Sequence, residues 1–234
     1  MRGAGSQSNA DYDLVSAVTG NRANPLNKSV QDRFYAFRDY ALGPLIDSTG
    51  DGLADGYTTI RGDLVGAPTA SPAVPASTFN DMLDFTLVDD PSDLADPNDF
   101  VTSNGYYIRL DTGGAGSGEK GLAAPTTIAG KLFFTTYLPE GVVSSSTCSL
   151  AEGRGQLYGL NAITGAAIFN WDNDAGGNIT AGDRVYTLGS GIPSNAVPVF
   201  FPEKVMLLVG VGGGAEAVDP GIALPQGRTY WFQQ

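Results

Sequence analysis

Three aspartates spaced four residues apart raise the question of what chemistry this sequence can perform. The stretch DSTGDGLADG (47–56) holds Asp47, Asp51 and Asp55, with a glycine directly after the second and the third. Carboxylates held this close repel one another unless a cation lies between them. The stretch is therefore either an acidic surface turn or a loop that folds around a metal ion.

The oxygen atoms of this stretch fall at offsets that suit calcium. Asp47, Thr49 and Asp51 take the first, third and fifth positions of a calcium loop, and Asp55 takes the ninth. The backbone carbonyl of Leu53 takes the seventh, directly after a glycine that allows a sharp turn. Calcium binds roughly 6 to 8 hard oxygen ligands. We therefore predict a Ca²⁺ site formed by these five residues.

An adhesion tripeptide follows shortly downstream, where Arg61, Gly62 and Asp63 spell RGD. On an exposed turn this tripeptide presents a cation and a carboxylate to an integrin-type receptor. The same tripeptide arises easily by chance, and a solvated turn is the plain alternative. Integrin-type recognition is therefore a hypothesis at this point.

A second acidic stretch, DNDAGGNITAGD (172–183), is a weaker candidate for ion binding. Asp172 and Asp174 take the first and third loop positions, but Gly176 stands at the fifth, which normally carries an acid. We interpret this stretch as a plain turn, with a second ion site as the alternative.

The composition excludes several kinds of catalytic site. The 234 residues contain no histidine and a single cysteine, Cys148. Without histidine the chain lacks the usual general base and the commonest zinc ligand. Histidine-dependent nucleophilic triads and Cys/His zinc sites are therefore ruled out. The lone cysteine is a buried apolar residue, a free thiol or half of a bridge to another segment.

The net charge and the hydrophobic pattern of the chain limit the kinds of partner that it can bind. Asp and Glu outnumber Lys and Arg by 25 to 13, which gives a net charge of -12. Such a chain repels nucleic-acid phosphates, and no apolar run is long enough to span a bilayer. We therefore expect no nucleic-acid partner and no membrane span. The polar start is not a signal peptide, so either a segment outside this sequence directs export or the protein is cytosolic.

The turn residues predict an all-β fold. The 32 glycines and 14 prolines suit short strands joined by tight turns, with hairpins at 129–130 and 202–203. One or two helical turns are expected from Ser77 or Thr78 through Leu83, in a connector at 64–100. Recurring strands favour a propeller or a sandwich. The expected strands lie within 11–19, 32–40, 104–111, 122–139, 155–172, 183–191, 196–212 and 227–234.

One segment carries a family resemblance. LYGLNAITGAAIFNW (157–171) joins a strand, an asparagine, a Thr-Gly turn, a second strand and a tryptophan. It resembles the blade repeat of quinoprotein-type propellers. The chain resembles the C-terminal propeller of PilY-type type IV pilus assembly and tip proteins in the order of this segment and five others, 19–39, 104–111, 121–139 with Cys148 in the Ser-rich loop after it, 188–200 and 227–234.

The resemblance implies a partial, several-bladed β-propeller of the quinoprotein-like type with long loops. Members of that family are much longer, so residues 1–234 would be the C-terminal part of a longer protein. A blade takes about 40 to 50 residues, so a seven-bladed ring does not fit in this chain and only some of the blades are expected. That protein would be exported to the cell surface or pilus tip, and would serve fimbrium biogenesis and cell adhesion without being an enzyme. Its partners would be minor pilins and pilus tip proteins, a host or surface receptor, and a missing N-terminal region or other chains that cover the blade edges.

The resemblance also bears on the acidic loop. An EF-hand would carry an acid or amide in place of Thr49 and a glutamate in place of Thr58. The nine-residue calcium loop of PilY-type propellers ends instead at the position of Asp55. Bound Ca²⁺ would then modulate pilus extension, retraction or adhesion by fixing one loop.

Two other functions stay open. A quinoprotein-like dehydrogenase would bind a quinone cofactor on a related propeller. An autonomous surface adhesin or extracellular filament subunit would use exposed blade edges. We interpret the large aromatic side chains as core or inter-blade packing and not as a cofactor site: Phe133, Phe134, Trp171, Phe200, Phe201 and Trp231.

Overall fold

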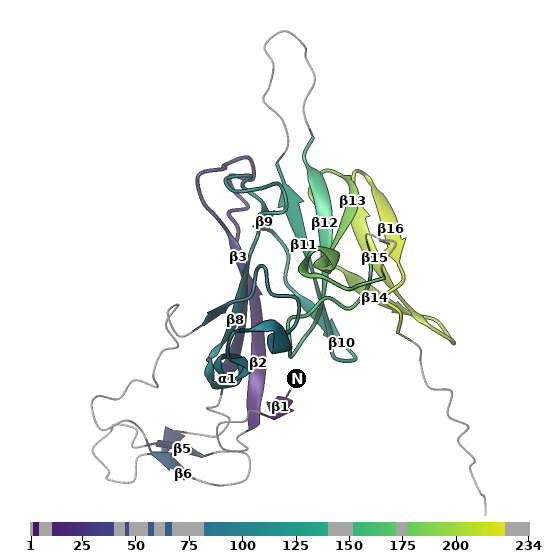
Figure 1. The fold of residues 1–234 in the computed structure, drawn as a ribbon. Coiled ribbons are helices and arrows are strands. Elements are labelled where there is room, and N and C mark those ends of the chain that lie inside the picture. Colours follow the sequence, from purple (N-terminus) through teal and green to yellow (C-terminus); the bar gives the residue numbers. More distant parts are fainter. Residues whose placement is uncertain are drawn as a thin grey trace, which may run out of the picture.

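The computed structural model describes residues 2–4, 11–39, 45–46, 56–58, 64–66, 82–139, 152–171 and 177–222. Within these ranges the chain is almost entirely β, as Figure 1 shows, so the all-β prediction is confirmed. The strands form four sheets, none of which closes into a barrel in the described part of the chain. We call the three larger ones sheets I, II and III in chain order.

Sheet I has five strands in the order β1-β2-β3-β8-β7. They are β1 (Arg2–Ala4), β2 (Asp11–Val18), β3 (Arg33–Asp39), β7 (Leu83–Asp84) and β8 (Gly105–Arg109). All pairings are antiparallel except that of β7 with β8. Residues along β3 alternate between buried and half-buried, because successive side chains of a strand point to opposite faces. Neighbours β3 and β8 are separated in the chain by residues 40–104.

Sheet II is an antiparallel meander, β10-β11-β12-β13, in which β9 also pairs with β11. Its strands are β9 (Lys120–Gly121), β10 (Thr126–Ile128), β11 (Lys131–Leu138), β12 (Arg154–Asn161) and β13 (Val185–Ser190). Nearly every residue of β11 and β12 is buried, instead of every second one. Both faces of this sheet must therefore be covered.

Sheet III and a small sheet complete the β structure. Sheet III is an antiparallel meander of β14 (Val197–Phe200), β15 (Val205–Val211) and β16 (Gly214–Val218). The small sheet holds β4 (Leu45–Ile46), β5 (Gly56–Thr58) and β6 (Leu64–Gly66). The helical elements of the described residues are α1 (Pro97–Thr102) and the 3-10 turns η2 (Pro91–Asp93) and η3 (Ala181–Arg184). In this part of the chain no helix has the length and apolar character needed to cross a membrane.

Sheets I and II pack face to face around one core. Phe34 of sheet I stacks on Phe134 of sheet II, with ring centroids 4.6 Å apart, and Phe134 stacks on Tyr158 at 4.5 Å. Stacked pairs of this kind contribute about 0.5–1.5 kcal/mol each beyond the area they bury. Fully or nearly fully buried Ile108, Leu132 and further apolar residues surround this aromatic column.

The opposite face of sheet II packs on sheet III. Phe133 and Leu157, which point away from sheet I, meet Leu207 and Val209 of β15 in a second core. Sheet II is thus the middle layer of a stack of three sheets (Figure 1). This stacking explains why β11 and β12 are buried along nearly their whole length, since neither face of sheet II meets water.

Both predicted hairpins are present. The turn between β10 and β11 consists of Ala129 and Gly130, whose φ angles are 48° and 78°. Two successive positive φ angles define the type I′ turn, which matches the right-handed twist of paired strands. The second hairpin joins β14 to β15 and is closed by a hydrogen bond from the Phe201 amide to the Lys204 carbonyl, 2.8 Å.

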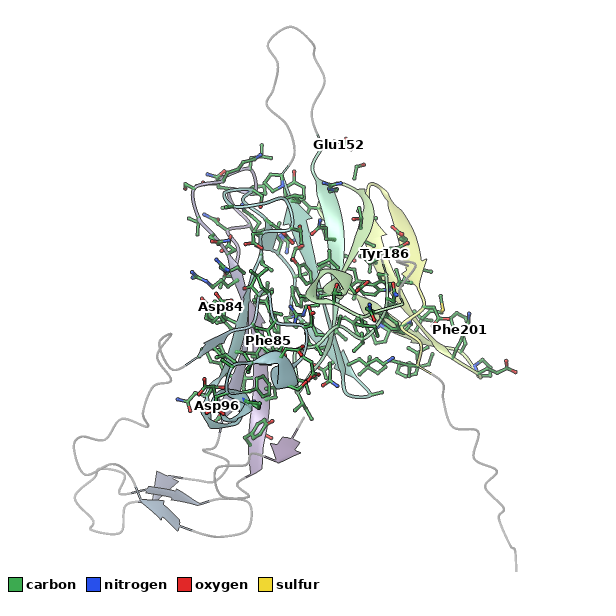
Figure 2. The ribbon with its side chains drawn as sticks, in the orientation of Figure 1. Asp84, Phe85, Asp96, Glu152, Tyr186 and Phe201 are labelled. Carbon is green, nitrogen blue, oxygen red and sulfur yellow. The ribbon has the colours of Figure 1, made fainter. Side chains whose placement is uncertain are left out.

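Three expectations need correction. The helical turns expected from Ser77 or Thr78 through Leu83 lie mostly outside the described residues, but 83–84 form a strand, and the expected connector holds a helix at 97–102, where a proline at its first position suits a helix start. The second half of 155–172 forms only an isolated bridge at Ala167 and no further strand. Phe200 and Phe201 are 62% and 47% exposed, because they lie at the turn of the β14–β15 hairpin, where Figure 2 labels Phe201.

Candidate functional site

The predicted calcium ligands lie outside the described residues. Asp47, Thr49, Asp51, Leu53 and Asp55 all belong to the segment that connects β4 to β5. These two strands pair antiparallel, and Ile46 lies opposite Gly56. The two ends of the segment are therefore held side by side by backbone hydrogen bonds.

The other sequence-predicted positions share this status. Arg61, Gly62 and Asp63 connect the paired strands β5 and β6 in the chain and lie outside the described residues. Three further positions also lie outside the described residues: Cys148, Trp231 and 172–176. Among the residues that the structure does describe, no cluster of three or more His, Cys, Asp or Glu side chains could hold a metal ion. The calcium prediction thus stays a prediction.

The described residues form a pocket of about 440 Å³ between sheets I and II. Its walls come from β8 and the segment after it, from β12 and β13, from η3, and from the residues that follow β7. Its rim carries Leu87, which is 82% exposed. Close to its floor lie Ile108 and Gln156, both nearly fully buried. Small-molecule sites typically measure about 300 to 1,000 Å³, so the pocket is large enough to be a binding site.

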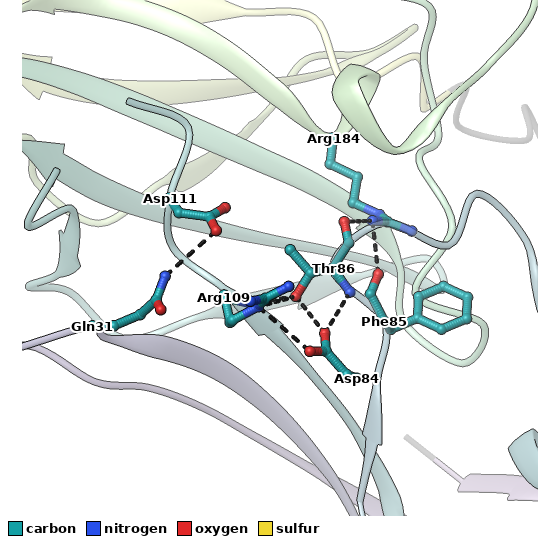
Figure 3. Close-up of polar contacts among 7 residues, drawn as sticks. All are labelled: Gln31, Asp84, Phe85, Thr86, Arg109, Asp111 and Arg184. Carbon is teal, nitrogen blue, oxygen red and sulfur yellow. Dashed lines mark hydrogen bonds and ion pairs between the residues drawn. The ribbon is translucent and has the colours of Figure 1, made fainter. Parts of the chain in front are cut away.

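Arg184 forms one wall of the pocket and clamps the two sheets together. Its side chain is 1% exposed. Its guanidinium donates to the Gly165 carbonyl at 2.9 Å, to the Phe85 carbonyl at 3.0 Å and to the Thr86 carbonyl at 3.2 Å. It also donates to the Val88 carbonyl. Figure 3 shows the contacts to Phe85 and Thr86. The planar guanidinium group of arginine can donate to several acceptors at once. In Arg184, each of its three nitrogens donates to at least one of these four carbonyl groups.

A second arginine lies on the neighbouring wall. Arg109 Nε is 3.4 Å from a carboxylate oxygen of Asp84 and 3.4 Å from the Thr86 hydroxyl oxygen. Asp84 in turn accepts from the Thr86 amide at 3.0 Å and the Thr86 hydroxyl at 2.6 Å (Figure 3). Burial alone raises the pKa of Asp84, but the two Thr86 bonds, with Tyr107 and Arg109, outweigh it and lower this pKa. Asp84 therefore stays ionised and holds Arg109 in place.

Behind the pocket lies a fully buried carboxylate. One oxygen of Glu119 accepts from the hydroxyls of Thr136 at 2.6 Å and Tyr158 at 2.9 Å. The other accepts from the amide of Thr112 at 2.8 Å, and the Thr112 hydroxyl lies 2.5 Å from it. Burial, and then the neighbouring Glu119 charge, raise the pKa of the Tyr158 hydroxyl well above its ordinary value. With both oxygens engaged, Glu119 stabilises the joint between the sheets.

Gln156 connects this buried network to the pocket. It is only 4% exposed, yet it lines the pocket. Its amide oxygen is placed 2.6 Å from the Thr112 hydroxyl oxygen. The other end of the amide makes no hydrogen bond to any residue that the structure describes. The unengaged end of the amide reaches the accessible space of the pocket and is not a buried group without a partner.

No local pattern in the sequence predicts this pocket. Arg184 binds carbonyl groups of residues 85–88, which lie almost a hundred positions earlier in the chain. Glu119 stands in the glycine-rich run SGEKG, which looks like an ordinary surface turn. Only the pairing of the two sheets brings these groups together.

Comparison with solved structures gives a similarity at the level of the fold. No protein-family model matches the chain, and no curated protein matches it. The crystal structure of the Pseudomonas aeruginosa PilY1 C-terminal domain aligns with a TM-score of 0.49 and 14% sequence identity. The alignment covers 95% of this chain and 44% of that one, so this chain spans less than half of its length. A similarity at this level shows neither a shared function nor a shared site.

Proposed function

We propose that this chain is a calcium-binding, non-enzymatic β-propeller part of a type IV pilus biogenesis and tip adhesin protein. The observation that carries the proposal is the ordered set of sequence segments centred on LYGLNAITGAAIFNW (157–171). The protein would be exported to the cell surface or pilus tip. There it would contact minor pilins, other tip proteins and a surface receptor.

The local structure of this segment supports the proposal. β12 ends at Asn161, whose side-chain oxygen accepts from the amides of Ile163 at 3.0 Å and Thr164 at 3.1 Å. Gly165, with a φ of 72°, completes the reversal. The chain then returns so that the Trp171 ring lies against Gly159 of the same strand, where a Cβ would come within 2.6 Å of the ring. The asparagine, the glycines and the tryptophan of the repeat thus have the roles that a strand–turn–return unit requires.

The sheet arrangement supports a propeller. Sheets II and III are antiparallel meanders, sheet I contains one, and the three stack face to face in chain order. Radial stacking of such sheets is the way propeller blades bury their faces. In this proposal the outer faces of sheets I and III are covered by further sheets or by other chains.

Calcium is proposed to act on the segment between β4 and β5. Asp47, Thr49, Asp51, the Leu53 carbonyl and Asp55 would bind the ion, and the paired strands would hold both ends of the segment. An ion that binds only the ordered segment stabilises it by mass action, by about 2.7 kcal/mol at a hundredfold excess over Kd. The Arg61-Gly62-Asp63 tripeptide begins six positions after Asp55, and in this proposal calcium controls how the tripeptide is presented to a receptor.

Calcium titration calorimetry tests the site. We expect one binding event and a higher melting temperature with Ca²⁺ than with chelator, and we expect Asp47→Ala to lose both. Glu203→Ala, which removes an exposed carboxylate from the β14–β15 hairpin, is the matched control and should keep both. No heat of binding in the unmodified chain would remove calcium from the proposal.

Immunogold labelling tests the pilus assignment independently of calcium. Antibodies raised against this chain are applied to intact cells of the source organism. We expect gold particles at the ends of surface fibres and on the outer surface. Labelling confined to the cell interior would overturn the assignment.

A further inference from the structure

The pocket between sheets I and II has an excess of positive charge in its lining. Three arginines line it, Arg109 from β8, Arg154 from β12 and Arg184 from η3, whereas Asp111 is the single acid among the lining residues. Three guanidinium groups against one carboxylate attract an anion and repel a cation. The chain as a whole has a net charge of -12, so this lining is opposite in sign to the molecule that carries it.

The charge of Arg184 is hydrogen-bonded only to neutral groups. Its guanidinium is almost fully buried and donates to four carbonyl groups, and the Asp89 carboxylate acts on it only at longer range. Burial lowers the pKa of Arg184 to about 10, so the group stays protonated at neutral pH. A buried charge is costly unless a counter-charge lies close to it. An anion in the pocket would supply that counter-charge.

The sheet II side of the pocket separates charge from neutral polar groups. Arg154, Gln156 and Tyr158 are every second residue of β12 and all line the pocket, as side chains on one face of a strand do. Arg154 is exposed, whereas Gln156 is nearly fully buried. A ligand can therefore place its anionic group at the mouth of the pocket, beside Arg154, and a polar, uncharged part deeper inside.

Asp111 requires more of the ligand than a negative charge. Its carboxylate can only accept hydrogen bonds, and from the described residues it accepts a long one, 3.4 Å, from the Gln31 amide (Figure 3). A bare inorganic anion has no donor to offer Asp111, whereas a hydroxyl group both donates and accepts. The lining therefore favours a ligand that carries hydroxyl groups beside its anionic group.

The geometry of the arginines favours a carboxylate as that anionic group. The Nε of Arg109 contacts Asp84 and Thr86, and its two terminal nitrogens make no hydrogen bond to any described residue. A guanidinium group binds a planar carboxylate through two parallel hydrogen bonds. A doubly charged phosphate would meet about twice the repulsion from Asp111 that a singly charged carboxylate meets.

We propose that this pocket binds a sugar acid, that is, a saccharide unit that carries one carboxylate. Arg154 and Arg109 bind the carboxylate, and Asp111 and Gln156 bind the hydroxyl groups. The volume of about 440 Å³ accommodates a ligand of this size class. The site is separate from the β4–β5 segment and independent of the pilus assignment.

Calorimetry with glucuronate, galacturonate and N-acetylneuraminate tests the proposal, with glucose and galactose as neutral counterparts. We expect at least one acid to bind and to lose affinity as NaCl is added, because salt screens exposed charges. Arg154→Gln should weaken binding of that acid about tenfold, with an unchanged melting temperature because Arg154 is exposed. Arg22→Gln removes the same charge from an exposed arginine outside this lining and should bind as the unmodified chain does.

Three results would overturn the proposal. The first is that none of the three acids binds at millimolar concentration, in calorimetry or in saturation-transfer NMR. The second is that a neutral sugar, or acetate, binds as tightly as the best acid, which would show a site that ignores either the carboxylate or the sugar. The third is binding unchanged by Arg154→Gln, which would place the site elsewhere. Asp111→Asn, which should also weaken binding, decides the question if Arg154→Gln fails to fold.

Discussion

Replacing Arg184 tests whether buried hydrogen bonds or buried charge dominate the joint between sheets I and II. Its guanidinium satisfies four carbonyl groups, from Gly165, Phe85, Thr86 and Val88. Arg184→Met fills a similar volume but removes every donor. Each buried acceptor left without a partner costs about 1–3 kcal/mol, although removing a buried cation returns part of its desolvation cost. We expect the free energy of unfolding to fall by about 2–4 kcal/mol.

Arg184→Lys separates the two effects. Lysine keeps the charge, but its single ammonium group cannot reach acceptors that are arranged around a planar fork. If the hydrogen bonds dominate, Arg184→Lys is destabilised nearly as much as Arg184→Met. The assay is urea unfolding followed by tryptophan fluorescence. Arg22→Met is the control, because the exposed Arg22 makes only one long bond, 3.5 Å, to the Leu122 carbonyl. A methionine variant as stable as the unmodified chain would refute the reasoning.

Three further predictions concern pH, backbone strain and adhesion. Burial raises the pKa of Tyr106, so the unfolded state loses the hydroxyl proton first, and the free energy of unfolding should fall as pH rises above about 10. Tyr106→Phe should flatten this fall, as measured by urea unfolding at a series of pH values. A pH dependence of stability equal to that of the unmodified chain would contradict the prediction. Gly165→Ala should lower the free energy of unfolding by about 2–3 kcal/mol, because the φ of Gly165 is 72° and a Cβ would lie 2.7 Å from the Tyr106 ring. Gly177, with a φ of 65°, has open space around its Cβ position. Gly177→Ala should therefore show only the smaller cost of backbone strain in the same unfolding assay. Asp63→Glu should abolish integrin-dependent cell attachment to the immobilised chain, whereas equal attachment would remove the RGD hypothesis.

Local features of the fold could be predicted from the sequence. The Ala129-Gly130 turn and the strands on either side follow from neighbouring residues, and the structure confirms them. The helical turns predicted from the capping residues Ser77 or Thr78 lie mostly outside the described residues, whereas the helix that starts at Pro97 in a run of acids was not predicted, because its six residues carry no apolar periodicity. Phe200 and Phe201 were expected inside because they are apolar. Their exposure depends on how far the β14–β15 hairpin extends beyond the core, which no local pattern reveals.

The pocket could not be predicted, for a physical reason. Its groups bind partners that are distant in the chain and that are mostly backbone carbonyls, which every residue has. Arg184 reaches residues 85–88, and Gln156 reaches Thr112. Such contacts leave no spacing or residue pattern in the sequence. The predicted calcium loop is the opposite case, since all its ligands lie within nine consecutive residues.

The pairing of β3 with β8 also bears on how this fold can change over evolutionary time. The two strands are joined by backbone hydrogen bonds, whereas the chain between them makes an excursion over residues 40–104. Doubling the length of such a loop adds only about 0.6 kcal/mol of closure entropy. The part of this connection that precedes β7, residues 40–82, can therefore be lengthened, shortened or exchanged at little cost to the stacked sheets, whereas β7, Phe85 and Phe100 belong to sheet I and its core. Residues 40–82 carry both the acidic loop and the RGD tripeptide, so binding properties can diverge between relatives while the three-sheet stack is retained.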